Sequence, residues 1–155
     1  MMRIIQGDFN DPRVIDLLEI HLSSALRETA RGSAHALDLA GLRATDVNFW
    51  TIWDGETLMG MGALKRLSAD HGEIKSTHTA QSVRRRGAGS AMLRHIIEIA
   101  RQSGMSRLSL ETGSWEYFLP ALALYRSHGF VECPPFAGHV RDTNSVFMSL
   151  DLNES

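Results

Sequence analysis

Three strand-like segments in a row, in the middle of the chain, are the feature that most limits how it can fold. They are residues 47–53, 58–65 and 73–79, and they are rich in β-branched, aromatic or alternating polar and apolar side chains. Asp54-Gly55 stands between the first two segments and is a strong signal for a tight hairpin turn. Because such a turn joins neighbouring antiparallel strands, the sequence predicts an antiparallel sheet at the centre of the fold.

Helical patterns stand on both sides of these strands. The predicted helices are one from Asp11-Pro12 to about Glu28, a shorter one at residues 36–40, and two later ones that end at Gly104 and Gly129. The remaining predicted strands are residues 2–6, 107–112, 130–133 and 145–152. Since strands and helices alternate late in the chain, we expect a mixed α/β (α+β) fold, with a mostly antiparallel sheet flanked by about four helices.

The composition fits one ordinary domain that spans residues 1–155. An apolar fraction of 43% is ample for a buried core, and a formal net charge of −2 gives no sign of a nucleic-acid or anionic-membrane partner. Cys133 is the one cysteine, and the seven histidines lack metal-ligand spacing, so we expect no disulfide and no metal site. No apolar stretch is long enough for a bilayer and the N-terminus lacks a secretory pattern, which together predict a cytoplasmic protein.

A basic, glycine-rich segment lies between the third strand and the next helix. It reads Arg84-Arg85-Arg86-Gly87-Ala88-Gly89-Ser90. A helix N-terminus attracts anions because its first N–H groups are unpaired, and glycines let a phosphate approach them. The segment lacks the lysine of a nucleoside-triphosphate loop, and Met92 replaces the small residue of a dinucleotide fingerprint. The sequence therefore predicts an anion site here, with a solvated arginine cluster beside a turn as the alternative.

Two motifs in the second half of the chain are similar to those of one enzyme family. Arg84-x-x-Gly87-x-Gly89 resembles the Gln/Arg-x-x-Gly-x-Gly/Ala signature of the GNAT acetyltransferase superfamily. The downstream segment with Ala121, Tyr125 and Gly129-Phe130 resembles the family's Ala-x-x-x-Tyr-x-x-x-Gly-Phe segment. This resemblance implies a single N-acetyltransferase domain that moves an acetyl group from acetyl-CoA to a primary amine of a small molecule or peptide, by direct attack on the thioester.

The same resemblance implies where the coenzyme lies. The strand that ends near Thr79 and the strand that starts near Arg107 are expected to splay apart, and the pantetheine arm to lie in the gap. The implied coenzyme-binding residues are Thr77, His78, Thr79, Arg84, Arg85, Arg86, Gly87, Ala88, Gly89, Ser90 and Tyr125. The chain departs from the family at Phe118, where many members carry an asparagine that contacts the coenzyme arm.

The catalytic residues are predicted in part from the resemblance and in part from the chemistry. Tyr125 matches the family's general acid. A phenol with an unperturbed pKa of about 10 stays protonated at neutral pH, so it can donate a proton to the departing thiolate. The alternative is a tyrosine that only packs in the core. Glu73 is the first candidate for the base, and Glu111 is a weaker one. His78 is less favoured, since strand alternation would place it on the other face of the strand from Glu73. A mechanism without a dedicated base is also compatible with the sequence.

The acceptor is not named by any motif. Candidate substrate residues, taken from the predicted loops and helix ends, are Arg31, His35, Trp115, Arg141 and Asn144. Of these, Arg31 or Arg141 could bind a carboxylate of an amino-acid-like acceptor. A non-catalytic acyl-CoA sensor is the second functional hypothesis, a protein-binding adaptor is the third, and a homodimer is compatible with either.

Overall fold

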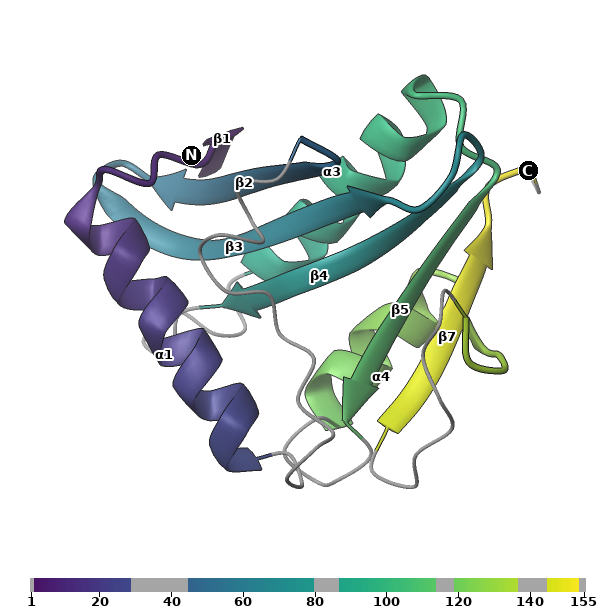
Figure 1. Cartoon of the computed structure of the whole chain (residues 1–155). Helices are drawn as coiled ribbons and strands as arrows, with labels where there is room; N and C mark the ends of the chain where they lie inside the picture. Colours follow the sequence, from purple (N-terminus) through teal and green to yellow (C-terminus); the bar gives the residue numbers. More distant parts are fainter. Residues whose placement is uncertain (1, 29–44, 80–86, 114–118, 137–144, 154–155) are drawn as a thin grey trace.

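The computed structural model of the chain describes residues 2–28, 45–79, 87–113, 119–136 and 145–153, and these form a seven-stranded sheet with three helices (Figure 1). The strands are β1 (Met2–Gln6), β2 (Val47–Asp54), β3 (Thr57–Arg66), β4 (His71–Thr79), β5 (Arg107–Gly113), β6 (Val131–Glu132) and β7 (Ser145–Asp151). The helices are α1 (Pro12–Glu28), α3 (Ala88–Gln102) and α4 (Leu119–Ser127). The strand order is β1-β2-β3-β4-β5-β7-β6, so the first and last parts of the chain occupy opposite edges of one sheet.

One pair of strands in this sheet is parallel, and the other pairs are antiparallel. The parallel pair, β4 and β5, is joined only where residues 71–74 pair with residues 107–110. Both strands continue past this ladder, β4 to Thr79 and β5 to Gly113, and Figure 1 shows them diverging. The mostly antiparallel sheet and its splay between these two strands are thus confirmed.

Helices cover both faces of the sheet. On one face, Val14 and Leu17 of α1 pack against Phe49, Met61 and Ala63. On the other face, α3 and α4 bury the larger core, whose fully buried side chains include Leu93, Ile96, Leu108, Leu110 and Met148. Figure 1 shows α1 in front of the sheet and the other two helices behind it.

The ends of the helices follow the predicted sequence signals. The carboxylate of Asp11 accepts a hydrogen bond from the backbone N–H of Arg13 (2.9 Å), as an N-cap does, and α1 begins at Pro12. Gly104 and Gly129 follow α3 and α4 with φ of 84° and 95°, which is the left-handed conformation that ends helices and favours glycine.

Two expected elements differ from the structure. The short helix at residues 36–40 lies outside the described residues, so three of the expected four helices are described. The strand expected at residues 130–133 is only Val131–Glu132, because Pro134 and Pro135 have no N–H group to extend the ladder. Within the described ranges, none of the helices combines the length and the hydropathy that crossing a membrane requires.

Candidate functional site

The N-terminus of α3 has the properties of an anion site. Gly87 precedes the helix with φ of 85°, no side chain caps this end by a hydrogen bond, and no acidic residue stands in the first turn. The first intrahelical bond runs from Ala91 N to Gly87 O, so the N–H groups of Ala88, Gly89 and Ser90 have no intrahelical acceptor. These amides and the positive end of the helix dipole favour a bound anion. Residues 84–86 are outside the described ranges, and the predicted role of the three arginines stays untested.

A short chain of hydrogen bonds links this end of α3 to the end of α4. Ser90 Oγ lies 3.0 Å from His128 Nε2, and Arg94 Nη1 donates to the same Ser90 oxygen (2.9 Å). Burial and the nearby Arg94 guanidinium lower the pKa of His128. Neither Arg94 nor His128 was predicted from the sequence. The spacing of four residues between Ser90 and Arg94 on one helix was the available signal.

Tyr125 lies on α4, in the core between the helices and the sheet. The residue is 6% exposed, and its ring packs against Phe130 with ring centroids 5.8 Å apart. The backbone N–H groups of His128 and Phe130 both donate to the Tyr125 carbonyl, so the turn at Gly129 fixes the tyrosine against the sheet. This burial fits a structural tyrosine as well as a proton donor, and the acid role of Tyr125 stays a prediction.

Glu73 lies on the other face of the sheet, in a row of polar side chains. Its neighbour Ile74 points into the core that contains Tyr125, and successive strand residues point to opposite faces. The Glu73 side chain is 4% exposed, and its Oε2 lies 3.4 Å from the Lys75 ammonium, whose side chain is 11% exposed. Glu73 also pairs in register with Ser109, which is fully buried. The candidate base is therefore one half of a buried ion pair, which the sequence did not predict.

The polar row continues on both sides of Glu73. His71 Nε2 lies 2.7 Å from Ser109 Oγ, and burial and Arg107 lower the pKa of His71. Glu111, the weaker candidate for the base, follows Leu110, the last β5 residue that pairs with β4. Glu73 thus lies within the β4–β5 ladder, and Glu111 lies just past its last pair, where the strands separate. Tyr125 lies on the other face of these strands.

The alternation argument against His78 does not hold in the structure. In the β3–β4 ladder, Met61 pairs with His78 and Ala63 pairs with Lys75, so β4 has one more residue than β3 between these pairs. This bulge shifts the alternation of β4 by one residue, and counting from Glu73 no longer assigns His78 to the opposite face. The side chains at this end of β4 are not described, so His78 stays open as a third candidate.

The predicted substrate residues are not placed by the structure. Arg31, His35, Trp115, Arg141 and Asn144 all lie outside the described ranges. For Thr77, His78 and Thr79, the strand is described but the side chains are not. Among the described residues, no group of three or more His, Cys, Asp and Glu could hold a metal ion.

Three histidines with lowered pKa values predict how stability depends on pH. Burial is the largest cause for His71, His95 and His128, and the ring of His95 meets Trp50 edge-on with centroids 4.9 Å apart. The unfolded chain binds protons below a pH of about 6.5, whereas the native histidines resist protonation. The free energy of unfolding, measured in urea, should therefore fall between pH 7 and pH 5. His95→Phe should make this fall shallower, and an equal slope in both proteins would contradict the assignment.

The fold, the splayed strands and the uncapped helix together define a class of protein. The profile of the Acetyltransferase (GNAT) family matches residues 14–130, which is most of the chain. The chain belongs to this family and is an acetyltransferase.

Relatives and solved structures agree with this assignment. The chain is 44% identical over 155 residues to the uncharacterized N-acetyltransferase YedL of Escherichia coli (strain K12), covering 100% of this chain and 98% of YedL. It is 46% identical over 151 residues to the uncharacterized N-acetyltransferase YsnE of Bacillus subtilis (strain 168), covering 97% and 100%. An acyl-CoA N-acyltransferase structure from Klebsiella pneumoniae superposes with a TM-score of 0.81 at 29% identity, over 98% of both chains. A Bacillus subtilis acetyltransferase solved in complex with CoA has the same fold, with a TM-score of 0.72, 20% identity and coverage of 97% and 99%.

Proposed function

We propose that this chain, as one domain over residues 1–155, transfers an acetyl group from acetyl-CoA to a primary amine of a small molecule or peptide. The observation that carries the proposal is the opening of the sheet between β4 and β5, beside the uncapped N-terminus of α3. Where the two strands separate, backbone N–H and C=O groups are not paired between β4 and β5 and can bind an extended ligand. At the helix end, the first N–H groups can bind a diphosphate. Coenzyme A combines both parts.

The residues around this opening fit the coenzyme. Gly87 and Gly89 carry no side chain that would cover the amides of the first turn. Among the described residues, the nearest atom to a Cβ placed at Gly87 would be Met2 Cε, 3.9 Å away, so no described side chain crowds the helix end where the diphosphate would bind. The bound coenzyme would supply the acetyl group as a thioester. The protein would orient it through the backbone of residues 77–79 and 87–90.

We propose that Tyr125 donates the proton that the departing thiolate needs. Its backbone carbonyl accepts hydrogen bonds from the turn at Gly129, and its buried ring packs against Phe130, so the position of the side chain is restrained. A buried donor that is positioned before the reaction needs no reorganisation when charge develops.

We propose that the acceptor approaches from the opposite face, where the carboxylates of Glu73 and Glu111 can accept a proton from an amine. Lys75, whose Nζ lies 3.4 Å from Glu73 Oε2, and Lys65, which pairs in register with Glu73, balance these two negative charges. Glu73 is the proposed base, and Glu111, nearer to the open end of the ladder, is the alternative. Attack of the neutral amine on the thioester carbonyl then transfers the acetyl group directly.

Two measurements test this function. Calorimetry should detect acetyl-CoA binding, and a panel of amino acids, polyamines and peptides should reveal an amine that causes acetyl-CoA consumption. Binding without consumption on any amine would favour the acyl-CoA sensor instead, and no binding would favour the adaptor.

A pair of matched variants tests the location of the coenzyme site. Gly87→Val should weaken acetyl-CoA binding at least about tenfold, because a β-branched residue disfavours positive φ and its side chain crowds the first amides. Gly104→Val places the same strain at the other end of the same helix, where φ is 84° and no atom of the described residues lies within 4 Å of an added Cβ. It should leave binding unchanged; equal losses in both variants would indicate a stability effect and contradict the site.

We propose a cytoplasmic enzyme, and a homodimer stays a prediction that size-exclusion chromatography with light scattering can check.

A further inference from the structure

Two residues of opposite charge lie where the opening between β4 and β5 begins. Ile74 and Leu110 form the last pair of the β4–β5 ladder, and both belong to the core behind the sheet. The next residues, Lys75 and Glu111, therefore point to the other face, because successive strand residues alternate. A positive and a negative side chain thus lie at the same step of two strands that diverge from there on (Figure 1).

Lys75 has hydrogen-bonding capacity for a second anion. Its side chain is 11% exposed, and its Nζ lies 3.4 Å from Glu73 Oε2, which is long for an ion pair. An ammonium carries three N–H donors, so one such contact leaves donors for a further acceptor. Because a covered charge is costly unless it is paired and hydrogen-bonded, a ligand carboxylate would stabilise this ammonium.

The charged groups beside the opening balance each other. Glu73 lies next to Lys75 on β4 and pairs in register with Lys65 on β3, and Glu111 is the second carboxylate. The two ammonium groups and the two carboxylates cancel in formal charge. Such a surface complements a ligand that carries both charges better than a ligand that carries one sign only.

We infer that the acceptor is a small amine that also carries a carboxylate, as a free amino acid does, and that Lys75 contacts this carboxylate. The inference rests on the proposed function, because it concerns the acceptor of that reaction. The Lys75 ammonium donates to the ligand carboxylate, while the ligand amine faces Glu73 and Glu111. The amine nitrogen forms a bond to the acetyl carbon and loses a proton to one of these carboxylates, the C–S bond breaks, and the thiolate takes a proton from Tyr125.

The same arrangement disfavours two other kinds of amine. A polyamine would bring a second positive charge next to the Lys75 ammonium, and the two like charges would repel each other. In a peptide, the first residue carries an amide in place of the carboxylate, so Lys75 would meet no anion beside the reacting amine. Lys75 thus determines specificity for a free amino acid.

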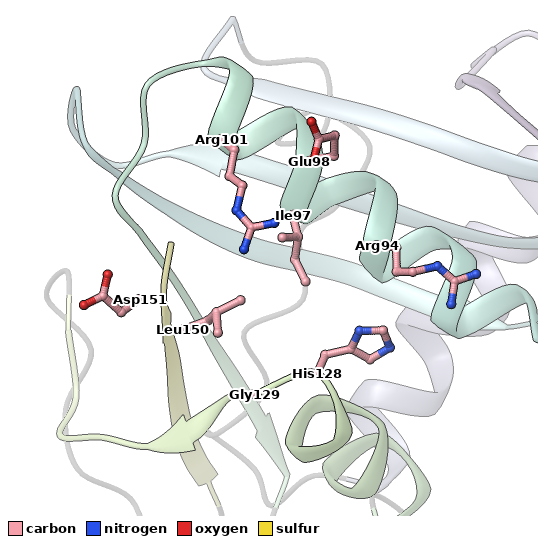
Figure 2. Close-up of a pocket in the computed structure, with 8 residues that line it drawn as sticks. All are labelled: Arg94, Ile97, Glu98, Arg101, His128, Gly129, Leu150 and Asp151. Carbon is pink, nitrogen blue, oxygen red and sulfur yellow. The ribbon is translucent and has the colours of Figure 1, made fainter. Parts of the chain in front are cut away.

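A hollow on the other face of the sheet provides a control position. It has a volume of about 530 Å³ and lies between α3, the turn after α4 and the end of β7 (Figure 2). Arg94, Glu98 and Arg101 line it from α3 and Asp151 lines it from β7, so its charges also balance. Because Arg101 lies behind the sheet, Arg101→Gln removes one positive charge from the protein without changing the opening beside Lys75.

Steady-state kinetics with L-leucine and L-leucinamide, and with the same pair of compounds for alanine and phenylalanine, test this inference. In Lys75→Gln the ratio of kcat/KM for the acid to kcat/KM for the amide should fall at least about tenfold, as expected for the loss of one charge-assisted contact. Lys75→Arg keeps the charge and should keep most of the ratio. Lys65→Gln, the matched change on the neighbouring strand, and Arg101→Gln should both keep the parent ratio.

This ratio is not affected by the two other differences that the experiment contains. The amine of the amide is less basic than that of the acid, but this difference is the same for every variant. Both compounds are measured on one preparation, so a lower folded fraction of Lys75→Gln changes both values equally.

Three results would overturn the inference. An unchanged ratio in Lys75→Gln, or an equal fall in Lys65→Gln, would show that Lys75 does not bind the carboxylate. Acetylation of putrescine or of a peptide, without acetylation of any amino acid, would overturn the acceptor class and leave the proposed acetyl transfer intact. Binding of acetyl-CoA with no consumption on any of these amines would overturn the proposed function, and this inference with it.

Discussion

Tyr125→Phe should lower turnover by about a hundredfold on the amine that the panel identifies, with the affinity for acetyl-CoA changed little. The variant keeps the ring that packs on Phe130 and removes only the hydroxyl, so the buried core of α4 is retained. A residue that donates a proton in the transition state affects turnover, whereas a residue that only shapes the core affects stability. Steady-state kinetics and calorimetry on the same preparations separate these two effects.

The control for this variant is the other tyrosine of the chain. Tyr117→Phe removes the same hydroxyl group at a position with no proposed catalytic role. Its turnover should match the parent. Equal turnover of parent and Tyr125→Phe would instead show that Tyr125 is a core residue, and the thiolate would then receive its proton from elsewhere.

Lys75→Met should destabilise the protein by about 3 kcal/mol, which is a large share of the stability of a domain of this size. Lys75 and Glu73 form an ion pair whose side chains are 11% and 4% exposed, so methionine would leave a buried carboxylate without its ammonium partner. The double variant Glu73→Gln with Lys75→Met removes both charges and should cost less than Lys75→Met alone. Urea unfolding of the parent and both variants at pH 8 measures these two differences.

A surface ion pair provides the comparison for this prediction. Arg126 and Glu132 are 3.1 Å apart with side chains 54% and 66% exposed, so Arg126→Met should cost less than about 1 kcal/mol. If Lys75→Met costs no more than this, then the pair on β4 does not act as a buried ion pair. Loss of activity in Lys75→Met with unchanged stability would indicate that Lys75 contacts the acceptor.

Contacts between side chains that are far apart in the chain could not be predicted from local sequence patterns. Arg94 and His128 are 34 positions apart, and no periodicity joins them, yet both contact Ser90 in the structure. The His71–Ser109 contact likewise depends on the parallel register of β4 and β5. Register between strands joined by a long crossover depends on packing over the whole sheet, which local patterns do not specify.

The sequence by itself determined the elements and their ends. The hairpin at Asp54-Gly55, the start of α1 at Pro12 and the glycines after α3 and α4 depend on backbone conformations of neighbouring residues, which are local properties. The two family motifs were also local, and they were sufficient to predict the class of enzyme.

Only the tertiary structure decided how the side chains of the site are combined. It placed Tyr125 and Glu73 on opposite faces of one opened sheet, joined Glu73 to Lys75, and introduced the bulge that invalidates the alternation from Glu73 to His78. Such features depend on contacts between elements that are far apart in the chain. A local pattern determines whether a segment forms a helix or a strand, whereas the packing of all segments determines which side chains it contacts.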